Sequence, residues 1–224
     1  MARVGFLIIA TNKYIQFVKP LLDGMKQFVH LDYEPFIFTD SDAAYLDNNI
    51  LYWEHRPFPY PTLMRYHAFT HNAEFLQHCE YLFYCDADMR FAGDVGEEIL
   101  GYLVAVQHPG FYNKLRSQFT YETRRISTAY IAPNEGTGYY CGGFQGGRTD
   151  QYLKMSEVLS NKVNEDLTKG IIAVWHDESH YNRYLIDNPP SLILSPSYCY
   201  PESWNLPFEK KLLALDKNHR DIRS

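Results

Sequence analysis

The chain has 224 residues, a formal net charge of −6 at pH 7, and hydrophobic residues at 46% of its positions. This length fits one α/β domain, and the composition is that of a globular protein. The acidic balance argues against a nucleic-acid partner, which needs a basic face, but it is compatible with a phosphate ligand held through a cation. The chain contains no apolar run of the roughly 18 residues that a membrane span requires.

The start of the chain and the cysteines favour a reducing compartment. The residues after Met1 lack the apolar core and the cleavage site of a signal peptide. The cysteines show neither a C-x-x-C pair nor a metal-binding spacing. We therefore expect a cytoplasmic protein with reduced, mostly buried thiols at Cys79, Cys85, Cys141 and Cys199.

Apolar runs and helical patterns alternate through the first half of the chain. Helices are predicted over residues 15–29 and 63–77. Short apolar runs predict strands at 4–10, 36–40, 49–53, 81–85 and 102–107. The proline-rich stretch 57–61 is expected to be neither helix nor inner strand. This order of elements predicts an α/β fold with an open, mostly parallel sheet.

The second half opens with an aromatic stretch, residues 108–138, that has no regular pattern and is expected to form a long irregular loop. The remaining pattern predicts strands at 139–144 (closed by Gly146-Gly147), 171–175 and 192–194, and helices at 150–161 and 177–186. The chain shows no internal repeat, low-complexity tract or linker. We therefore expect a single domain.

Polar residues follow three of the predicted strands. Thr11, Asp40 and Asp86 stand at carboxyl ends, and open α/β sheets bind their ligands beyond those ends. In Asp86-Ala87-Asp88, two carboxylates directly after a buried strand form a compact oxygen-ligand site for a divalent cation. The alternative interpretation is a polar turn or a helix cap.

A second acidic cluster lies at Trp175-His176-Asp177-Glu178-Ser179-His180. Histidines at i and i+4 resemble a zinc protease site, but that motif has Glu directly after the first His, where this chain has Asp177. Carboxylates in a first helical turn would also complement the helix dipole. A glycine-rich segment at 139–147 matches neither a dinucleotide fingerprint nor a P-loop.

Together these segments resemble one family, the retaining glycosyltransferases of the blood-group A/B and α1,3-galactosyltransferase type (glycosyltransferase family 6). The resemblance rests on these stretches, in chain order: Phe38-Thr39-Asp40, Asp86-Ala87-Asp88-Met89, His108-Pro109-Gly110-Phe111-Tyr112, Phe119-Thr120-Tyr121-Glu122, Tyr139 to Phe144, Trp175 to His180, Leu194-Ser195-Pro196 and Lys217-Asn218-His219. It implies a GT-A fold, with a nucleotide-binding part at about residues 1–107 fused to an acceptor-binding part at about 108–224.

The resemblance also implies a role for individual residues. Asp86 and Asp88 match the D-x-D that holds Mn²⁺ against the UDP diphosphate, where the ion acts as a Lewis acid. Glu178 matches the acidic residue beside the anomeric carbon. The positions that match donor-binding residues are Ile9, Thr11, Tyr14, Arg65, Asp86, Ala87, Asp88, Cys141, Gly142, Gly143, Asp177, Lys217 and Arg223. The positions that match acceptor-binding residues are His108, Thr120 and Trp175.

The resemblance implies transfer of GalNAc from UDP-GalNAc to a galactose-containing glycan, with an α1,3 link and retention. Gly143 leaves room for an N-acetyl group, whereas Ala there suits galactose, so UDP-galactose is the alternative donor. Cys141 departs from the Leu or Met that is usual in the family. The absence of an anchor and stem resembles bacterial or phage members. A catalytically idle sugar- or nucleotide-binding module and a zinc hydrolase are the competing interpretations.

Overall fold

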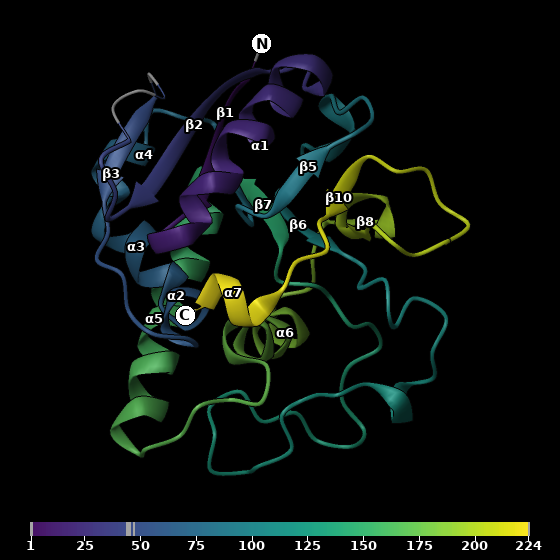
Figure 1. Cartoon of the computed structure of the whole chain (residues 1–224). Helices are drawn as coiled ribbons and strands as arrows, with labels where there is room; N and C mark the ends of the chain where they lie inside the picture. The colour runs from purple at the N-terminus through teal and green to yellow at the C-terminus, as the bar shows by residue number, and fades with distance from the viewer. Residues whose placement is uncertain (1, 44–45, 47, 224) are drawn as a thin grey trace.

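The computed structural model describes residues 2–43, 46 and 48–223 (Figure 1). A seven-stranded sheet runs through the molecule in the order β3-β2-β1-β4-β7-β6-β8. Its strands are β1 (Arg3–Ile9), β2 (Asp32–Thr39), β3 (Asn49–Tyr52), β4 (Tyr81–Cys85), β6 (Leu103–Val106), β7 (Phe144–Arg148) and β8 (Leu192–Leu194). Only β7 runs against its neighbours, β4 and β6. The mostly parallel sheet expected from the sequence is therefore confirmed.

Helices cover both faces of this sheet (Figure 1). The described helices are α1 (Ile15–Phe28), α2 (Tyr60–Leu63), α3 (Arg65–His71), α4 (Ala73–Leu76), α5 (Thr149–Thr168), α6 (His176–Asp187) and α7 (His219–Arg223). Short 3₁₀ turns are η1 (Asn12–Tyr14), η3 (Glu97–Ile99), η4 (Arg116–Gln118) and η5 (Pro196–Cys199). Successive β1 side chains point to opposite faces: Phe6 and Ile8 join the α1 core, whereas Leu7 and Ile9 join the core of α3, α5 and α6.

A second, three-stranded sheet has the order β5-β10-β9. Its strands are β5 (Met89–Phe91), β9 (Tyr200–Pro201) and β10 (Leu212–Ala214). The Leu215 N–H donates to the Asp88 carbonyl at 3.0 Å, immediately after β10. This small sheet therefore brings the C-terminal segment beside the aspartate pair, across the front of the molecule in Figure 1.

The predicted helix over residues 63–77 is interrupted. The backbone leaves the helical region at Met64 and Asn72, which separate α2, α3 and α4. The Asn72 side chain donates to the Ala68 carbonyl at 2.8 Å, and such local side-chain bonds end helices. The expectation for residues 57–61 was wrong in part, because α2 begins at Tyr60 with Pro61 in its first turn, where proline is tolerated.

Two predicted strands were wrong. Instead of a strand at 139–144, β7 begins at Phe144 and contains Gly146 and Gly147. A Cβ on Gly146 would lie 2.3 Å from Phe83 Cδ1, so this glycine allows close packing against β4 instead of ending the strand. Residues 171–175 form no strand; the Val174 N–H donates to Glu122 Oε2 at 2.9 Å instead of to a neighbouring strand.

The stretch 108–138 is irregular, as expected, apart from the short 3₁₀ turn η4. It packs around a small core of its own residues Tyr121 and Ile131 and the following Tyr139, against which Phe111 and Phe119 pack. The Tyr121 and Tyr139 rings stack at 5.2 Å. Aromatic packing therefore fixes this loop where strand hydrogen bonds are missing.

Candidate functional site

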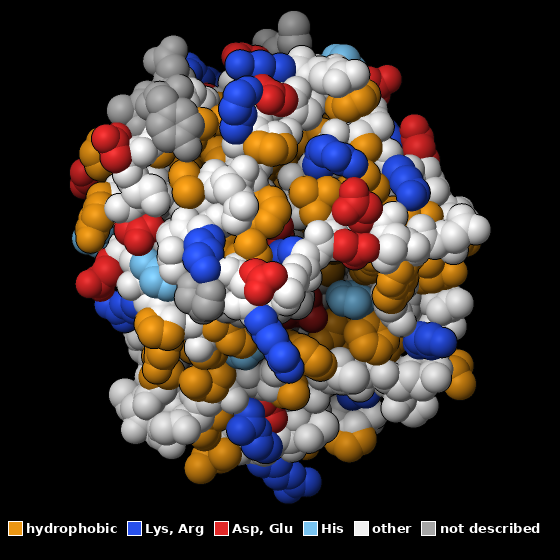
Figure 2. Space-filling model, in the orientation of Figure 1, with side chains coloured by type: hydrophobic (Ala, Val, Ile, Leu, Met, Phe, Trp, Pro, Cys, Tyr) orange, Lys and Arg blue, Asp and Glu red, His pale blue; other side chains and the backbone are white. Residues whose placement is uncertain are grey.

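A cavity of about 140 Å³ opens beyond the carboxyl ends of β1 and β4. Its lining includes Ile9, Thr11, Tyr14, Asp86, Ala87, Asp88 and Lys217, all of them expected at a donor site. The space-filling view shows a hollow beside α7 with an acidic side chain at its floor (Figure 2). Asp40 is not among the described residues that line this cavity. Its Oδ1 accepts a hydrogen bond from the Asn12 N–H at 2.7 Å.

A second cavity, of about 300 Å³, adjoins the first and shares Phe58, Thr62 and Asp86 with it. The other residues that line it include Arg65, Gly142, Gly143, Trp175, Asp177 and Glu178. The two acidic clusters of the sequence therefore meet at Asp86, between a cavity at the sheet edge and a cavity beside Glu178.

Arg65 contacts both acidic clusters. Its side chain is 3% exposed, and its guanidinium lies 3.3 Å from Asp86 Oδ1 and 3.2 Å from Asp177 Oδ2. It also donates to the Gly142 carbonyl at 2.7 Å and stacks over the Tyr84 ring at 4.1 Å. This buried cation offsets the repulsion between two carboxylates and fixes their positions.

Asp86 and Asp88 differ in what surrounds their oxygens. Asp86 Oδ1 accepts hydrogen bonds from the Tyr84 hydroxyl at 2.5 Å and from Arg65, so those two groups hold one of its oxygens. Asp88 is buried, and its Oδ2 accepts no hydrogen bond within the described residues but lies against the Lys217 ammonium. The Lys217 ammonium shows that the buried Asp88 oxygen attracts a positive charge. Together with the neighbouring Asp86 carboxylate, this oxygen provides the ligand type that a hard divalent cation prefers.

Lys217 belongs to the C-terminal segment that crosses the first cavity. Its ammonium also lies 5.9 Å from the centre of the Tyr14 ring. Ile222 lines the same cavity, and the Lys13 ammonium donates to the Asp221 carbonyl at 2.9 Å. Arg223 ends α7, but its side chain lies outside the described part of the chain.

Glu178 stands in the first turn of α6, where its Oε2 accepts a hydrogen bond from the Gly142 N–H at 2.8 Å. Burial raises the pKa of Glu178 to about 7, although the Gly142 N–H opposes this, and the charge of Asp177 raises it further. Burial also raises the pKa of Asp177 to about 6 against the opposing charge of Arg65. The cavity therefore contains two carboxyl groups that ionise near neutral pH.

Of the three expected acceptor residues, Trp175 lines the second cavity, and contacts through Thr120 and Tyr139 link it to His108. The Trp175 indole N–H donates to Thr120 Oγ1 at 2.8 Å, and Thr120 Oγ1 donates to the Tyr139 hydroxyl at 3.5 Å. The His108 ring contacts Tyr139 edge-on at 5.5 Å, and its Nδ1 accepts from the Gly110 N–H at 3.0 Å. Burial lowers the pKa of His108 to about 4, so the ring is neutral.

The two histidines of α6 contact different parts of the molecule. His176 lies edge-on against the Phe58 ring at 5.0 Å. His180 is buried on the α5 side, where its Nε2 is 3.8 Å from Asp166 Oδ2 and its Nδ1 is 3.4 Å from Thr128 Oγ1. This arrangement gives no support to a zinc hydrolase at this motif.

The family model of glycosyltransferase family 6 matches residues 62–224. The chain belongs to glycosyltransferase family 6. It is 34% identical to the rat histo-blood group ABO system transferase 1 (99% of this chain, 68% of the relative). It is 34% identical to the human globoside alpha-1,3-N-acetylgalactosaminyltransferase 1 (98% and 67%) and 29% identical to the O-antigen biosynthesis glycosyltransferase WbnI of Escherichia coli (96% and 94%).

Membership of this family confirms the expectation from the sequence and shows that the chain is a hexosyltransferase. The mixed α/β architecture with its large, mostly parallel sheet is consistent with the expected GT-A fold. Such an enzyme takes a nucleotide-sugar donor and a glycan acceptor. Within the described residues, no helix combines the length and apolar character that crossing a membrane requires.

Three residues of this family 6 enzyme were missed at the sequence level. His55 lines the first cavity and its Nδ1 lies 3.0 Å from Thr11 Oγ1, but nothing in the sequence around it marks it. Tyr84 stands two residues before Asp86, and the two-residue period of a strand could have placed both side chains on one face. Tyr139 interacts with the Glu178 side chain and lowers its pKa, and so joins the expected acceptor residues to the candidate catalytic residue.

Proposed function

We propose that this enzyme transfers GalNAc from UDP-GalNAc to a galactose-containing glycan, with retention and with Mn²⁺ as cofactor. The observation that carries the proposal is the meeting of the two acidic clusters at Asp86, where two adjoining cavities share its side chain. One cavity offers a carboxylate pair for a cation and a diphosphate. The other offers Glu178 to the sugar carbon that reacts.

The donor nucleotide is assigned to the cavity at the sheet edge. Tyr14 supplies an aromatic face for the uracil, and Ile9 and Thr11 line the same cavity. Asp86 and Asp88 would hold Mn²⁺, which when bound stabilises the negative charge on the leaving diphosphate. Lys217 adds a second positive charge beside Asp88, and Arg223 is assigned to the same closing segment.

Glu178 is the assigned catalytic residue. As a nucleophile, its ionised Oε would bond to the anomeric carbon while the sugar–phosphate bond breaks, and the acceptor oxygen would then displace it with loss of its proton. Alternatively, its charge would stabilise the oxocarbenium-like sugar while the acceptor attacks from the leaving-group side. Both routes retain the anomeric configuration and both require the carboxylate form.

The donor choice rests on Gly143. It lines the cavity beside Glu178, where an added Cβ would crowd Asp86 Oδ2 at 2.9 Å, and we assign the N-acetyl group of the donor to this cavity. Two relatives that are N-acetylgalactosaminyltransferases by name support this choice. Arg65, Asp177, Cys141 and Gly142 are assigned to the donor sugar. His108, Thr120 and Trp175 are assigned to the acceptor, since Trp175 lines the same cavity.

The test is a panel of UDP-sugars with Mn²⁺, read as UDP release, followed by a glycan array with the preferred donor. We expect the fastest turnover with UDP-GalNAc and products on galactose-terminated glycans. Faster turnover with UDP-galactose would reverse the donor choice. Absence of UDP release with every donor and acceptor, from protein that still binds UDP, would favour a binding module.

The metal assignment has a separate test in the Asp88→Asn variant. Calorimetry should show that Mn²⁺ strengthens UDP binding to the parent protein and has little effect on this variant, because one of the two carboxylates is lost. Equal UDP affinity with and without Mn²⁺ in the parent protein would contradict the cofactor assignment.

A further inference from the structure

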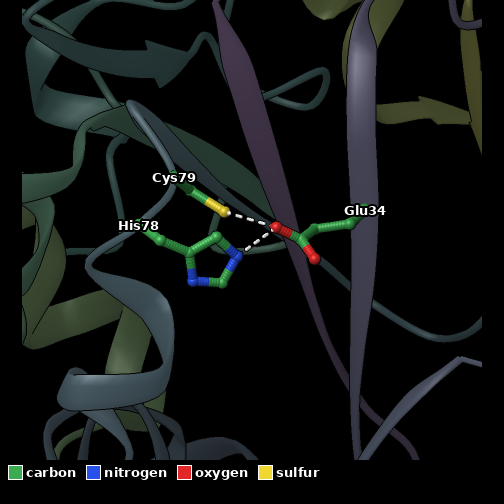
Figure 3. Close-up of side chains that lie close together, drawn as sticks. All are labelled: Glu34, His78 and Cys79. Carbon is green, nitrogen blue, oxygen red and sulfur yellow. Dashed lines mark hydrogen bonds and ion pairs between the residues drawn. The ribbon is translucent and has the colours of Figure 1, made fainter.

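A cluster of three different metal-binding side chains lies away from the donor site. Glu34 comes from β2, and His78 and Cys79 come from the segment between α4 and β4 (Figure 3). Glu34 pairs in register with Gly5, near the amino end of β1, whereas the donor cavity opens at the carboxyl ends of β1 and β4. The cluster therefore lies at the end of the large sheet where the parallel strands begin, opposite the donor cavity.

The three side chains point toward one another (Figure 3). Cys79 Sγ lies 3.2 Å from Glu34 Oε1, and His78 Nε2 is also hydrogen-bonded to that oxygen. One ligand atom from each residue lies within 4.8 Å of the others. Ligands of a tetrahedral zinc ion are separated by about 3.3–3.7 Å, given bonds of about 2.0–2.3 Å, so a small adjustment of these side chains makes room for the ion.

We propose that Glu34, His78 and Cys79 bind one Zn²⁺ ion, with water as the fourth ligand. A thiolate and an imidazole are ligands of a borderline metal such as zinc, whereas Mn²⁺ and Mg²⁺ prefer the all-oxygen set of Asp86 and Asp88. The thiolate and the carboxylate together cancel the two positive charges of the ion.

Binding exchanges protons for the metal. The Cys79 thiol loses its proton to solvent and bonds to zinc through Sγ, and the hydrogen bond to Glu34 breaks. His78 binds through Nε2 as the neutral imidazole, with its proton on Nδ1. Without metal, burial and the neighbouring Glu34 raise the pKa of Cys79 to about 12, so we expect zinc binding to release the thiol proton.

The surroundings support a site that is ordered yet accessible. Cys79 is buried, while the His78 side chain is 48% exposed and leaves an entry route. The Asn49 amide donates to Glu34 Oε2 at 3.2 Å and orients the carboxylate. Arg3 Nε lies 2.8 Å from Glu34 Oε1, but its side chain is half exposed, so it can turn into solvent when zinc takes that oxygen.

The test is calorimetry with Zn²⁺ and absorption spectroscopy with Co²⁺ on the full chain, without nucleotide. The Asp88→Asn variant serves as the background, because it weakens the other cation site. We expect one zinc ion per chain and a thiolate-to-cobalt absorption band. Cys79→Ser should remove the band, and both Cys79→Ser and His78→Ala should lower the zinc affinity at least about tenfold.

The matched control is His30→Ala. His30 is an exposed histidine that also pairs with a carboxylate, Asp94, at 2.8 Å, but among the described residues it belongs to no group of three metal-binding side chains. Its loss should leave zinc affinity and the cobalt band unchanged. Circular dichroism of each variant checks folding. Equal zinc affinity of the parent protein and the folded Cys79→Ser variant would overturn the proposal, and neither readout depends on sugar transfer.

Discussion

The Gly142 N–H donates a hydrogen bond to Glu178 Oε2 at 2.8 Å, which ties the glycine segment before β7 to the first turn of α6. One carboxyl group thus receives a backbone donor while it is partly buried in the cavity wall. Burial has the larger effect and raises the pKa of Glu178 to about 7. The native protein therefore keeps a proton on this group at pH values where the unfolded chain has released it.

The first prediction concerns stability. Because the folded pKa of Glu178 is raised, its contribution to the free energy of unfolding is present below about pH 4.5 and is lost as the pH rises through about 7. Glu178→Gln keeps a hydrogen-bond acceptor for Gly142 but cannot ionise. We expect this variant to be more stable than the parent by about 1–2 kcal/mol at about pH 8 and by close to zero at about pH 4.

Urea unfolding across this pH range measures the difference. The matched control is Glu165→Gln on α5, whose exposed carboxylate pairs with Lys169 at 2.8 Å and should show no such gain at high pH. A Glu178→Gln variant that is less stable than the parent at about pH 8 would show that the carboxylate is stabilised in the fold.

The second prediction concerns activity. The carboxylate form of Glu178 is required for either role at the anomeric carbon, so Glu178→Gln should lower donor turnover by on the order of 10²–10⁴-fold. In the parent enzyme, kcat/KM should fall as the pH is lowered through about 7 to about 6, as Glu178 and then Asp177 take up protons. A pH profile of UDP release that stays flat down to about pH 5 would contradict this assignment.

The third prediction concerns Lys217, whose ammonium lies against the Asp88 carboxylate. Lys217→Met should strengthen Mn²⁺ binding in the absence of nucleotide, because a competing cation is removed. It should also lower kcat by on the order of 10²-fold, because a charge that stabilises the leaving diphosphate is lost. Removal of residues 217–224 should impair turnover in the same way with the fold intact.

Calorimetry with Mn²⁺ and steady-state UDP release separate these two effects. Lys19→Met is the matched control, since Lys19 also pairs with an aspartate, Asp23, at 2.8 Å but lies on the exposed side of α1. Unchanged Mn²⁺ affinity in Lys217→Met would show that the ion and the ammonium do not compete for Asp88.

The fourth prediction concerns Gly143. A Cβ at this position would lie 2.9 Å from Asp86 Oδ2 and 3.3 Å from Met89 Cε. Gly143→Ala should therefore weaken Mn²⁺ binding and lower turnover with both donors, and the added methyl group should reduce UDP-GalNAc turnover by about 10–200-fold. The ratio of UDP-galactose to UDP-GalNAc turnover should rise.

Gly142→Ala is the comparison for this experiment, because its Cβ would approach Asp177 Oδ2 at 3.1 Å instead of Asp86. It should impair turnover and leave Mn²⁺ affinity close to that of the parent. If both alanine variants bind Mn²⁺ as the parent does, Asp86 Oδ2 does not contribute to the metal site as proposed.

The sequence predicted best those elements that have a strong local pattern. The strands at Tyr81–Cys85 and Leu192–Leu194 were predicted with their observed bounds. The predicted strand over 139–144 failed because the position of β7 depends on contact between Gly146 and Phe83, which are far apart in the chain. The strands β5, β9 and β10 were not predicted, because they have two or three residues each and are defined by pairing between segments far apart in the chain.

The candidate site was predicted through short acidic motifs and a family resemblance. These identified Asp86, Asp88 and Glu178, and the structure places all three at two adjoining cavities. The local sequence could not show that Arg65 is buried between Asp86 and Asp177, because this depends on how α3, β4 and α6 pack. The same holds for His55, which reaches Thr11 from a segment without a recognisable pattern.

The position of β7 between β4 and β6 determines whether fragments of the chain can fold separately. A backbone cut within residues 108–138 would leave β4 on one fragment and its partner β7 on the other. The first fragment would then end its sheet at an open β4 whose hydrogen-bonding groups invite pairing between molecules. Fragments made separately should therefore aggregate, whereas fragments made in the same cell should rejoin through β7, which pairs with β4 and β6, and through β8, which pairs with β6.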